Sequence, residues 1–114
     1  ILEIVAGMID SGETPSDAAR RECLEETGCS VKELREIYSY YPAPGSSESY
    51  YHFFLAKVDS FEGEKIFGQK NENEDILVKS YSIKEIKNLI KKKKIINAAT
   101  LLALQWFFLE YYEN

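Results

Sequence analysis

The sequence predicts an α/β domain in which a mixed β-sheet is sandwiched between helices. Apolar stretches rich in β-branched and aromatic residues alternate with segments that carry helix-capping signals. Their order, strand then helix, further strands and then helices, favours helices on both faces of one sheet. The chain has 114 residues, 45% of them hydrophobic, which is the usual size of one domain and enough to bury a core.

The N-terminal part predicts a strand followed by a helix. Ile1–Gly7 is apolar and ends in glycine, which is typical of a buried strand. Thr14 is a suitable N-cap and Pro15 suits the first helical position, so a helix is expected to begin there. It should run to about Thr27, with Gly28 as a left-handed C-terminal cap.

The middle of the chain predicts extended structure. Leu34–Tyr41 and Tyr50–Val58 are rich in Tyr, Phe, Ile and Val and are expected to be strands. Pro42–Ser47 cannot continue either strand and predicts a loop. Phe61–Asp75 is polar and predicts a second loop with room for one short strand, and Ile76–Tyr81 predicts a further strand.

Two helices are expected at the C-terminal end. Ser82 and Glu85 form the pattern of a capping box for a helix that runs to about Lys92. Asn97 is a suitable cap for a last helix, Ala98–Tyr112, whose apolar content suggests one face against the sheet.

Charge and apolar patterning exclude several classes of partner. The 14 Lys and Arg against 19 Asp and Glu give a net charge of −5, which argues against a nucleic-acid binder. The basic run Lys91–Lys94 is expected to be a solvated helix end, with a phosphate or membrane patch as the minor alternative. The apolar stretch Leu101–Leu109 is too short to span a bilayer, so no membrane partner is expected and the cytoplasm is the default location.

Two further observations concern the start of the chain and its thiols. The first residue is Ile1 rather than Met, within a strand already under way, so the chain is expected to lack an N-terminal segment of a longer protein. Cys23 and Cys29 are the only cysteines, and the chain has a single His, so a zinc site is not expected. Both cysteines are interpreted as small packing residues.

Acidic side chains gather on the first predicted helix. Glu22, Glu25 and Glu26 stand at i, i+3 and i+4, so they share one helical face, and Glu13 can fold back toward it. Mg²⁺ binds through a few carboxylates together with substrate phosphates, so this pattern is typical of a metal site for phosphate chemistry. The alternative is a solvated acidic face that pairs locally with Arg20 and Arg21.

The spacing of these residues resembles a family motif. Gly7, Glu13 and the segment Arg21–Cys29 match the Nudix box, G-x5-E-x7-R-E-U-x-E-E-x-G-U, in which U is a bulky aliphatic residue. Every polar and glycine position of the motif is filled, while Cys23 and Cys29 occupy two U positions. The sequence is therefore identified as a member of the Nudix hydrolase superfamily, and the resemblance implies the α/β/α Nudix fold over residues 1–114.

The resemblance assigns roles to the residues of the box. It implies Glu22 and Glu26 as the main Mg²⁺ ligands, Glu25 as a further ligand that takes part in catalysis, and the carbonyl of Ala6 beside them. Arg21 and Glu13 would orient the ligand carboxylates. Gly7 would let the chain turn next to the metal, and Gly28 would end the helix.

Four segments outside the box resemble the bacterial ADP-ribose pyrophosphatase branch of this superfamily: Tyr41–Ser46, Tyr50–Asp59, Asn71–Ile76 and Asn97–Trp106. The first of these segments is a loop, and the resemblance implies substrate contacts from its Pro44 and Gly45 and from Glu48 and Ser49, which follow it. Family members often carry a Glu five residues after the loop proline, where this chain has Ser49, and its Glu48 stands one position earlier. The tyrosine pairs at 40–41 and 50–51 are interpreted mainly as core or sheet-face residues.

The acidic loop Asn71–Asp75 has two interpretations. It is either a solvated loop before a strand or, as the resemblance implies, the source of the catalytic base. Glu72 is the predicted base, with Glu74 as the second candidate, and Glu74 is also a predicted metal ligand.

These resemblances imply one activity and leave two alternatives. The expected reaction is hydrolysis of the diphosphate bond of ADP-ribose to AMP and ribose 5-phosphate, dependent on Mg²⁺ or, alternatively, Mn²⁺. The first alternative is a Nudix hydrolase of another nucleoside diphosphate derivative such as GDP-mannose, and the second is a Nudix-fold binding module without catalysis. The expected partner is a small-molecule nucleoside diphosphate, with neither nucleic acid nor membrane, in a homodimer.

Overall fold

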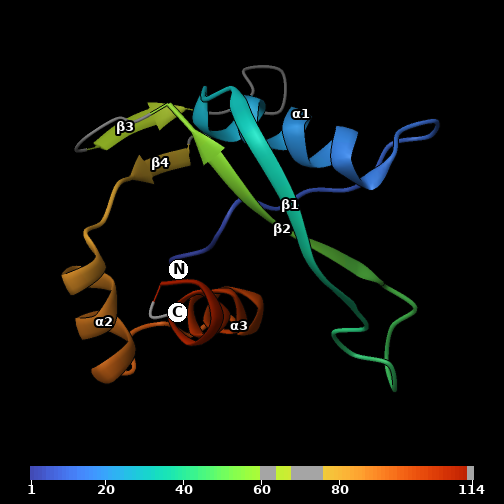
Figure 1. Cartoon of the computed structure of the whole chain (residues 1–114). Helices are drawn as coiled ribbons and strands as arrows, with labels where there is room; N and C mark the ends of the chain where they lie inside the picture. The colour runs from blue at the N-terminus through green and yellow to red at the C-terminus, as the bar shows by residue number, and fades with distance from the viewer. Residues whose placement is uncertain (60–63, 68–75, 113–114) are drawn as a thin grey trace. The chain divides into compact units, whose positions relative to one another are not determined.

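The computed structural model describes residues 1–59, 64–67 and 76–112. Its internal contacts divide the chain into two compact units (Figure 1). The central unit is Val5–Ser80, and the terminal unit combines Ile1–Ile4 with Tyr81–Asn114. Helices and strands succeed one another along the chain, so the α/β class predicted from the sequence is confirmed.

The first helix, α1 (Pro15–Thr27), begins and ends where its capping residues predict. The Thr14 hydroxyl accepts a hydrogen bond from the Asp17 amide at 3.1 Å, and the Asp17 carboxylate accepts one from the Thr14 amide at 3.3 Å. Gly28 ends the helix in the left-handed region, with φ 73°, and its amide donates to the Leu24 carbonyl at 2.8 Å.

Two antiparallel ladders make up the strands of the central unit. Strands β1 (Val31–Tyr40) and β2 (Tyr51–Val58) form a long hairpin, in register from Val31 opposite Val58 to Tyr40 opposite Tyr51. Strand β3 (Glu64–Phe67) pairs with β4 (Ile76–Lys79). The three strands predicted after the first helix, and the short strand within the second loop, are thus present, with ends that are shorter or shifted.

Helix α1 packs against β1 and also contacts β3 and β4, within the central unit (Figure 1). The buried side chains of this unit include Ala18 and Cys23 from the helix, Cys29 from the turn after it and Phe53 from β2. Helix α1 is therefore held partly by its buried apolar side chains.

The prediction of a buried strand over Ile1–Gly7 is wrong. These residues have no regular secondary structure, and Ile1 is 90% exposed. The reason is that their amides bond to side chains instead of to a neighbouring strand: Ile4 N–H donates to Thr100 Oγ1 at 3.1 Å, and Ala6 N–H donates to Glu26 Oε2 at 3.2 Å. An apolar, β-branched sequence forms a strand only where a ladder partner is in reach.

The terminal unit contains two capped helices. Helix α2 (Ile83–Lys91) has the predicted capping box, in which the Ser82 hydroxyl and the Glu85 carboxylate each accept a backbone hydrogen bond at 3.0 Å. Helix α3 (Ala98–Trp106) begins after Asn97, whose side-chain oxygen accepts a hydrogen bond from the Thr100 amide at 2.9 Å. Thr100 is 2% exposed, and its hydroxyl also holds the Ile4 amide.

The last helix does not continue as an α-helix to Tyr112. It changes at Phe107 to a π-helical segment, η2 (Phe107–Tyr112). In this winding the i and i+5 side chains align, and the rings of Phe107 and Tyr112 stack with an interplanar angle of 23° and centroids 5.9 Å apart. The π-helical segment thus coincides with a run of aromatic residues.

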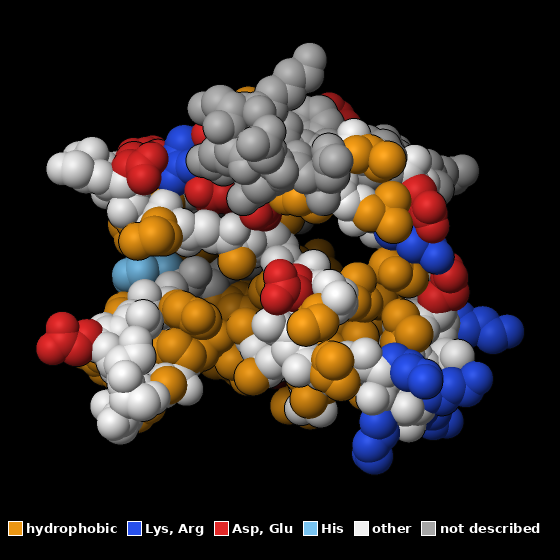
Figure 2. Space-filling model, turned by 180° about the vertical axis from the view of Figure 1, so that it is seen from behind, with side chains coloured by type: hydrophobic (Ala, Val, Ile, Leu, Met, Phe, Trp, Pro, Cys, Tyr) orange, Lys and Arg blue, Asp and Glu red, His pale blue; other side chains and the backbone are white. Residues whose placement is uncertain are grey.

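The four lysines Lys91–Lys94 are exposed, as predicted for a solvated helix end. Blue side chains of this part of the terminal unit are visible together at one side of Figure 2. Among the described residues, no helix combines the length and the apolarity that crossing a bilayer requires.

Candidate active site

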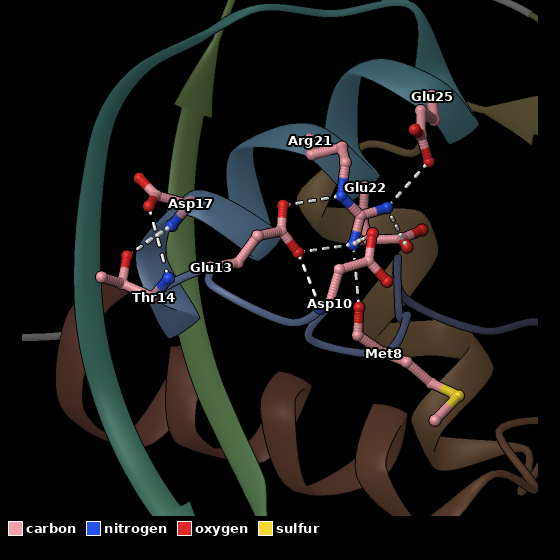
Figure 3. Close-up of polar contacts among 8 residues, drawn as sticks. All are labelled: Met8, Asp10, Glu13, Thr14, Asp17, Arg21, Glu22 and Glu25. Atoms are coloured by element: carbon pink, nitrogen blue, oxygen red, sulfur yellow. Dashed lines mark hydrogen bonds and ion pairs between the residues drawn. The ribbon is translucent and has the colours of Figure 1, made fainter.

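A polar cluster joins α1 to the loop before it, and Arg21 lies at its centre (Figure 3). The Arg21 side chain leaves α1 in the middle of the helix and is 26% exposed. Helical periodicity places Glu22 and Glu25 beside it, while the loop brings Met8, Asp10 and Glu13 to its other side.

Toward the loop, Arg21 and Glu13 form a two-point contact. Arg21 Nε donates to Glu13 Oε2 at 2.8 Å, and Nη2 donates to Glu13 Oε1 at 3.0 Å. Nη2 also donates to the Met8 carbonyl at 2.8 Å and lies 3.4 Å from Asp10 Oδ2. The Asp10 amide donates to Glu13 Oε1 at 2.8 Å, so the loop closes on itself around the guanidinium.

Toward the helix, one guanidinium nitrogen reaches two carboxylates. Arg21 Nη1 donates to Glu22 Oε1 at 2.7 Å and to Glu25 Oε2 at 3.0 Å. The hydrogen bonds that Arg21 donates to Glu13 and Glu22 raise the pKa of Arg21. The hydrogen bond from Arg21, followed by that from the Asp10 amide, lowers the pKa of Glu13. Arg21 therefore stays charged, and its fork geometry fixes the two carboxylates of the helix relative to the loop.

Two consecutive backbone positions lie against the glutamates of α1. The Ala6 amide donates to Glu26 Oε2 at 3.2 Å, one helical turn from Glu22. A Cβ atom on Gly7 would overlap the carboxyl group of Glu22, so only glycine admits this side chain so close to the backbone. Ala6, Gly7, Glu22 and Glu26 thus form one compact group.

The donor set fits a hard divalent cation. It consists of carboxylate groups, and the missing side chain at Gly7 is what admits the Glu22 carboxyl group. The contact that Ala6 makes with Glu26 is through its amide and not through the predicted carbonyl. Within the described part of the chain, no group of three or more His, Cys, Asp or Glu side chains is arranged to hold a metal ion. The hydrogen bonds account for this arrangement. One oxygen of Glu22 and one of Glu25 accept hydrogen bonds from Arg21, and one oxygen of Glu26 accepts a hydrogen bond from the Ala6 amide.

The acidic residues also stand at the negative end of the helix dipole. Glu22, Glu25 and Glu26 lie in the second half of α1, and the last turn of the helix carries no basic residue. This end of the helix therefore concentrates negative charge, which favours a cation nearby.

A second group of predicted residues surrounds a pocket at the tip of the β1–β2 hairpin. The pocket has a volume of about 320 Å³ and is lined by Tyr41, Pro44, Ser47 and Glu48. The loop folds through hydrogen bonds from the Ser46 and Ser47 amides to the Ala43 carbonyl, at 3.1 and 2.9 Å. Of the predicted substrate residues, Pro44 and Glu48 line the pocket. Gly45 lies in the same loop, and Ser49 bonds to Ser47 through its amide at 3.1 Å.

Some predicted site residues lie outside the described residues, and some residues of the cluster were not predicted from the sequence. Glu72 and Glu74, the predicted base and metal ligand, lie outside the described residues. Met8 and Asp10 were missed in the box cluster. Met8 acts through its backbone carbonyl, which leaves no sequence signal, whereas the Asp10-Ser11-Gly12 turn next to Glu13 could have suggested Asp10. Tyr41 was interpreted as a sheet-face residue, yet it is 59% exposed and lines the pocket.

Comparison with known proteins shows the family of the chain. The NUDIX domain family matches residues 2–104. An ADP-ribose pyrophosphatase of Escherichia coli K12 is 39% identical over 111 residues, which cover 97% of this chain and 53% of that protein. An ADP-ribose pyrophosphatase of Bacillus subtilis is 34% identical over 110 residues, covering 96% of this chain and 58% of that protein.

A relative with a different printed substrate is also similar. A GDP-mannose pyrophosphatase of Citrobacter koseri is 32% identical over 106 residues, covering 93% of this chain and 54% of that protein. The chain spans about half the length of the curated relatives that it matches. Because the family match extends over residues 2–104 and includes the whole Arg21 cluster, this chain belongs to the Nudix domain family.

Proposed function

We propose that this chain is the catalytic part of a Nudix hydrolase that cleaves the diphosphate bond of ADP-ribose to AMP and ribose 5-phosphate. The observation that carries the proposal is the grouping of Glu22 and Glu26 against the backbone of Ala6 and Gly7, with Arg21 beside them. Relatives named ADP-ribose pyrophosphatase support the choice of substrate.

The cofactor in this proposal is Mg²⁺, with Mn²⁺ as the alternative. Glu22 and Glu26 would hold it, assisted by Glu25, by the backbone at Ala6 and by Glu74, which lies outside the described residues. When bound, the cation neutralises charge on the diphosphate. The protein's own part is positional, since Arg21 fixes Glu22 and Glu25, and Glu13 in turn fixes Arg21.

Hydrolysis also needs a general base and a binding site for the substrate. We propose Glu72 as the base that takes the proton from the attacking water, with Glu74 as the second candidate. The pocket lined by Tyr41, Pro44, Ser47 and Glu48 offers an aromatic ring, a hydroxyl and a carboxylate, which suit a base or ribose group of a nucleotide. Gly45 and Ser49 would contribute through the shape and hydrogen bonds of the loop.

The decisive experiment compares wild-type protein with Glu22→Gln and Glu26→Gln, using ADP-ribose and Mg²⁺ and separating the products by chromatography. Loss of a metal-binding carboxylate should lower kcat at least roughly 100-fold while the circular dichroism spectrum is retained. Glu33→Gln, an exposed glutamate on β1, is the matched control and should keep full activity. Undiminished turnover in both site variants would refute the metal assignment.

A second substrate is favoured by one specific observation, the similarity to a GDP-mannose pyrophosphatase. Parallel measurement of kcat/KM for ADP-ribose and GDP-mannose separates the two candidates, and a higher value for GDP-mannose would move the assignment to nucleotide sugars. Binding of both compounds without turnover in the presence of Mg²⁺ or Mn²⁺ would favour the binding-module alternative.

The assembly is inferred from the resemblance, and the location is the default for a chain in which no membrane-spanning stretch is expected. We propose a homodimer in the cytoplasm, and light scattering coupled to size-exclusion chromatography tests the first part. A mass near 13.1 kDa would indicate a monomer of this chain.

A further inference from the structure

We propose that Cys23 and Cys29 form an oxidisable dithiol site at the C-terminal end of α1. These are the only cysteines of the chain, and both are buried, with 8% exposure each. They also occupy the two positions at which the Nudix pattern has bulky aliphatic residues, so packing alone does not require sulfur there.

The end of the helix brings the two residues together. Gly28 adopts the left-handed conformation, and its amide bonds to the Leu24 carbonyl. In such caps the chain reverses, and the residue after the glycine returns to the last turns of the helix. Cys29 is that residue, and Cys23 lies in those turns.

The hydroxyl group of Thr27 joins the two cysteines. Thr27 Oγ1 donates to the Cys23 carbonyl at 2.6 Å and accepts from the Cys29 amide at 3.1 Å. Both sulfur atoms contact the same threonine, Cys23 Sγ at 3.7 Å from its hydroxyl oxygen and Cys29 Sγ at 3.7 Å from its carbonyl oxygen. Both thiols therefore lie against the same residue at the end of the helix, and we infer that they can reach each other.

The proposed reaction is a two-electron oxidation by a peroxide. One thiol attacks the peroxide, forming a sulfenic acid and releasing water. The second thiol then attacks that sulfur, so an S–S bond forms and the sulfenic oxygen leaves as a second water. The two electrons lost by the sulfurs reduce the O–O bond of the peroxide, and a dithiol reductant reverses the change.

The bond would act on the carboxylates of the helix, and this step rests on the proposed function. The segment between the cysteines contains Glu25 and Glu26. Closing the bond would replace the contacts of both sulfurs with Thr27, and the proposal is that the end of α1 then moves and Glu26 leaves its position against the Ala6 amide. A displacement of about 1 Å at such a site is enough to lower turnover roughly tenfold or more.

The site itself is tested without any substrate. Reduced protein is treated with hydrogen peroxide, its remaining thiols are alkylated under denaturing conditions, and tryptic peptides are weighed. Cleavage after Arg21 and Lys32 gives one peptide, residues 22–32, that contains both cysteines. The expected product is this peptide lighter by two hydrogens and not alkylated, with no cross-linked dimer on a non-reducing gel.

Three results would overturn the site: two alkylated thiols, a peptide that has gained oxygen, or a disulfide between two chains. The single variants Cys23→Ala and Cys29→Ala are matched controls, since neither can close the bond. If the peptide is oxidised as expected but ADP-ribose turnover of the same sample is unchanged, the coupling to Glu25 and Glu26 is refuted while the dithiol site stands. If reduced protein has no turnover at all, the proposed function fails and the thiol chemistry is unaffected.

Discussion

Arg21 and Glu13 share two parallel hydrogen bonds, 2.8 and 3.0 Å long, which tie the loop before α1 to the middle of the helix. The contact uses one edge of the guanidinium, so Nη1 remains directed at Glu22 and Glu25. The loop thereby determines where the helix glutamates are held.

Replacing Arg21 by lysine should therefore damage activity although the positive charge is kept. A single ammonium group cannot contact Glu13 in two places and still reach Glu22 and Glu25. We expect kcat for ADP-ribose to fall about 10- to 100-fold, the usual cost of losing a residue that orients metal ligands. The neighbouring Arg20→Lys is the control, because Arg20 makes one hydrogen bond, to the Val31 carbonyl at 3.2 Å. Equal kcat values for the two variants would contradict an orienting role for Arg21.

The stability contributed by Glu13 should depend on pH. Hydrogen bonds from Arg21 and the Asp10 amide lower the pKa of Glu13 below its ordinary value of 4.5. A lowered carboxyl pKa stabilises the folded state fully above the unfolded value and ceases to do so as the pH falls through the folded value. Urea unfolding should thus show wild-type protein more stable than Glu13→Gln at about pH 7, with the difference shrinking below about pH 4.5. Glu33→Gln is the control for the general effect of removing one negative charge. If the difference in stability between wild-type protein and Glu13→Gln grows on acidification, the stabilising role of the Glu13 carboxylate is refuted.

The close approach of Gly7 to Glu22 predicts that Gly7→Ala is harmful. The added methyl group would overlap the Glu22 carboxyl group, so either the loop or the glutamate must move. We expect a loss of about 1–3 kcal/mol in the free energy of unfolding, as for other overpacked sites, together with reduced turnover. Gly45→Ala serves as the control for stability, because, apart from its chain neighbours, no atom of the described residues lies within 4 Å of its added Cβ. A fully stable and active Gly7→Ala protein would show that Glu22 does not need this position.

In the terminal unit, the Thr100 hydroxyl should contribute measurably to stability. Thr100 is 2% exposed, and its Oγ1 accepts from the Ile4 amide at 3.1 Å and donates to Asn97 Oδ1 at 2.8 Å. Thr100→Val keeps the shape but removes these bonds, so a loss of about 1–3 kcal/mol is expected. Thr100→Ser keeps the hydroxyl and should lose less stability. Thermal unfolding of the two variants tests this, and equal losses would contradict a contribution from the hydroxyl.

Local signals were the most reliable guide from sequence to structure. Thr14, Pro15 and Gly28 predicted both ends of α1, because capping depends on residues within one turn of each other. Ser82 with Glu85 likewise predicted where α2 begins. Features that depend on distant partners were harder to predict. Ile1–Gly7 has strand-forming residues, but its amides at Ile4 and Ala6 bond to Thr100 and Glu26.

The site could be predicted as far as spacing on a helix allows. The i, i+3, i+4 pattern placed the three glutamates on one side of α1, and the box spacing brought in Gly7, Glu13 and Arg21. It did not predict that Arg21 engages Glu22 and Glu25 at the same time as Glu13, because this depends on the path of the loop. The role of the Met8 carbonyl could not be predicted either, since any residue has one.

The absence of a basic residue in the last turn of α1 has an energetic consequence. Three anionic side chains near the carbonyl end of a helix repel one another and face the negative end of its dipole. For Glu22 and Glu25, the hydrogen bonds that Arg21 donates offset this repulsion. The acidic end of α1 therefore depends on Arg21 for its stability.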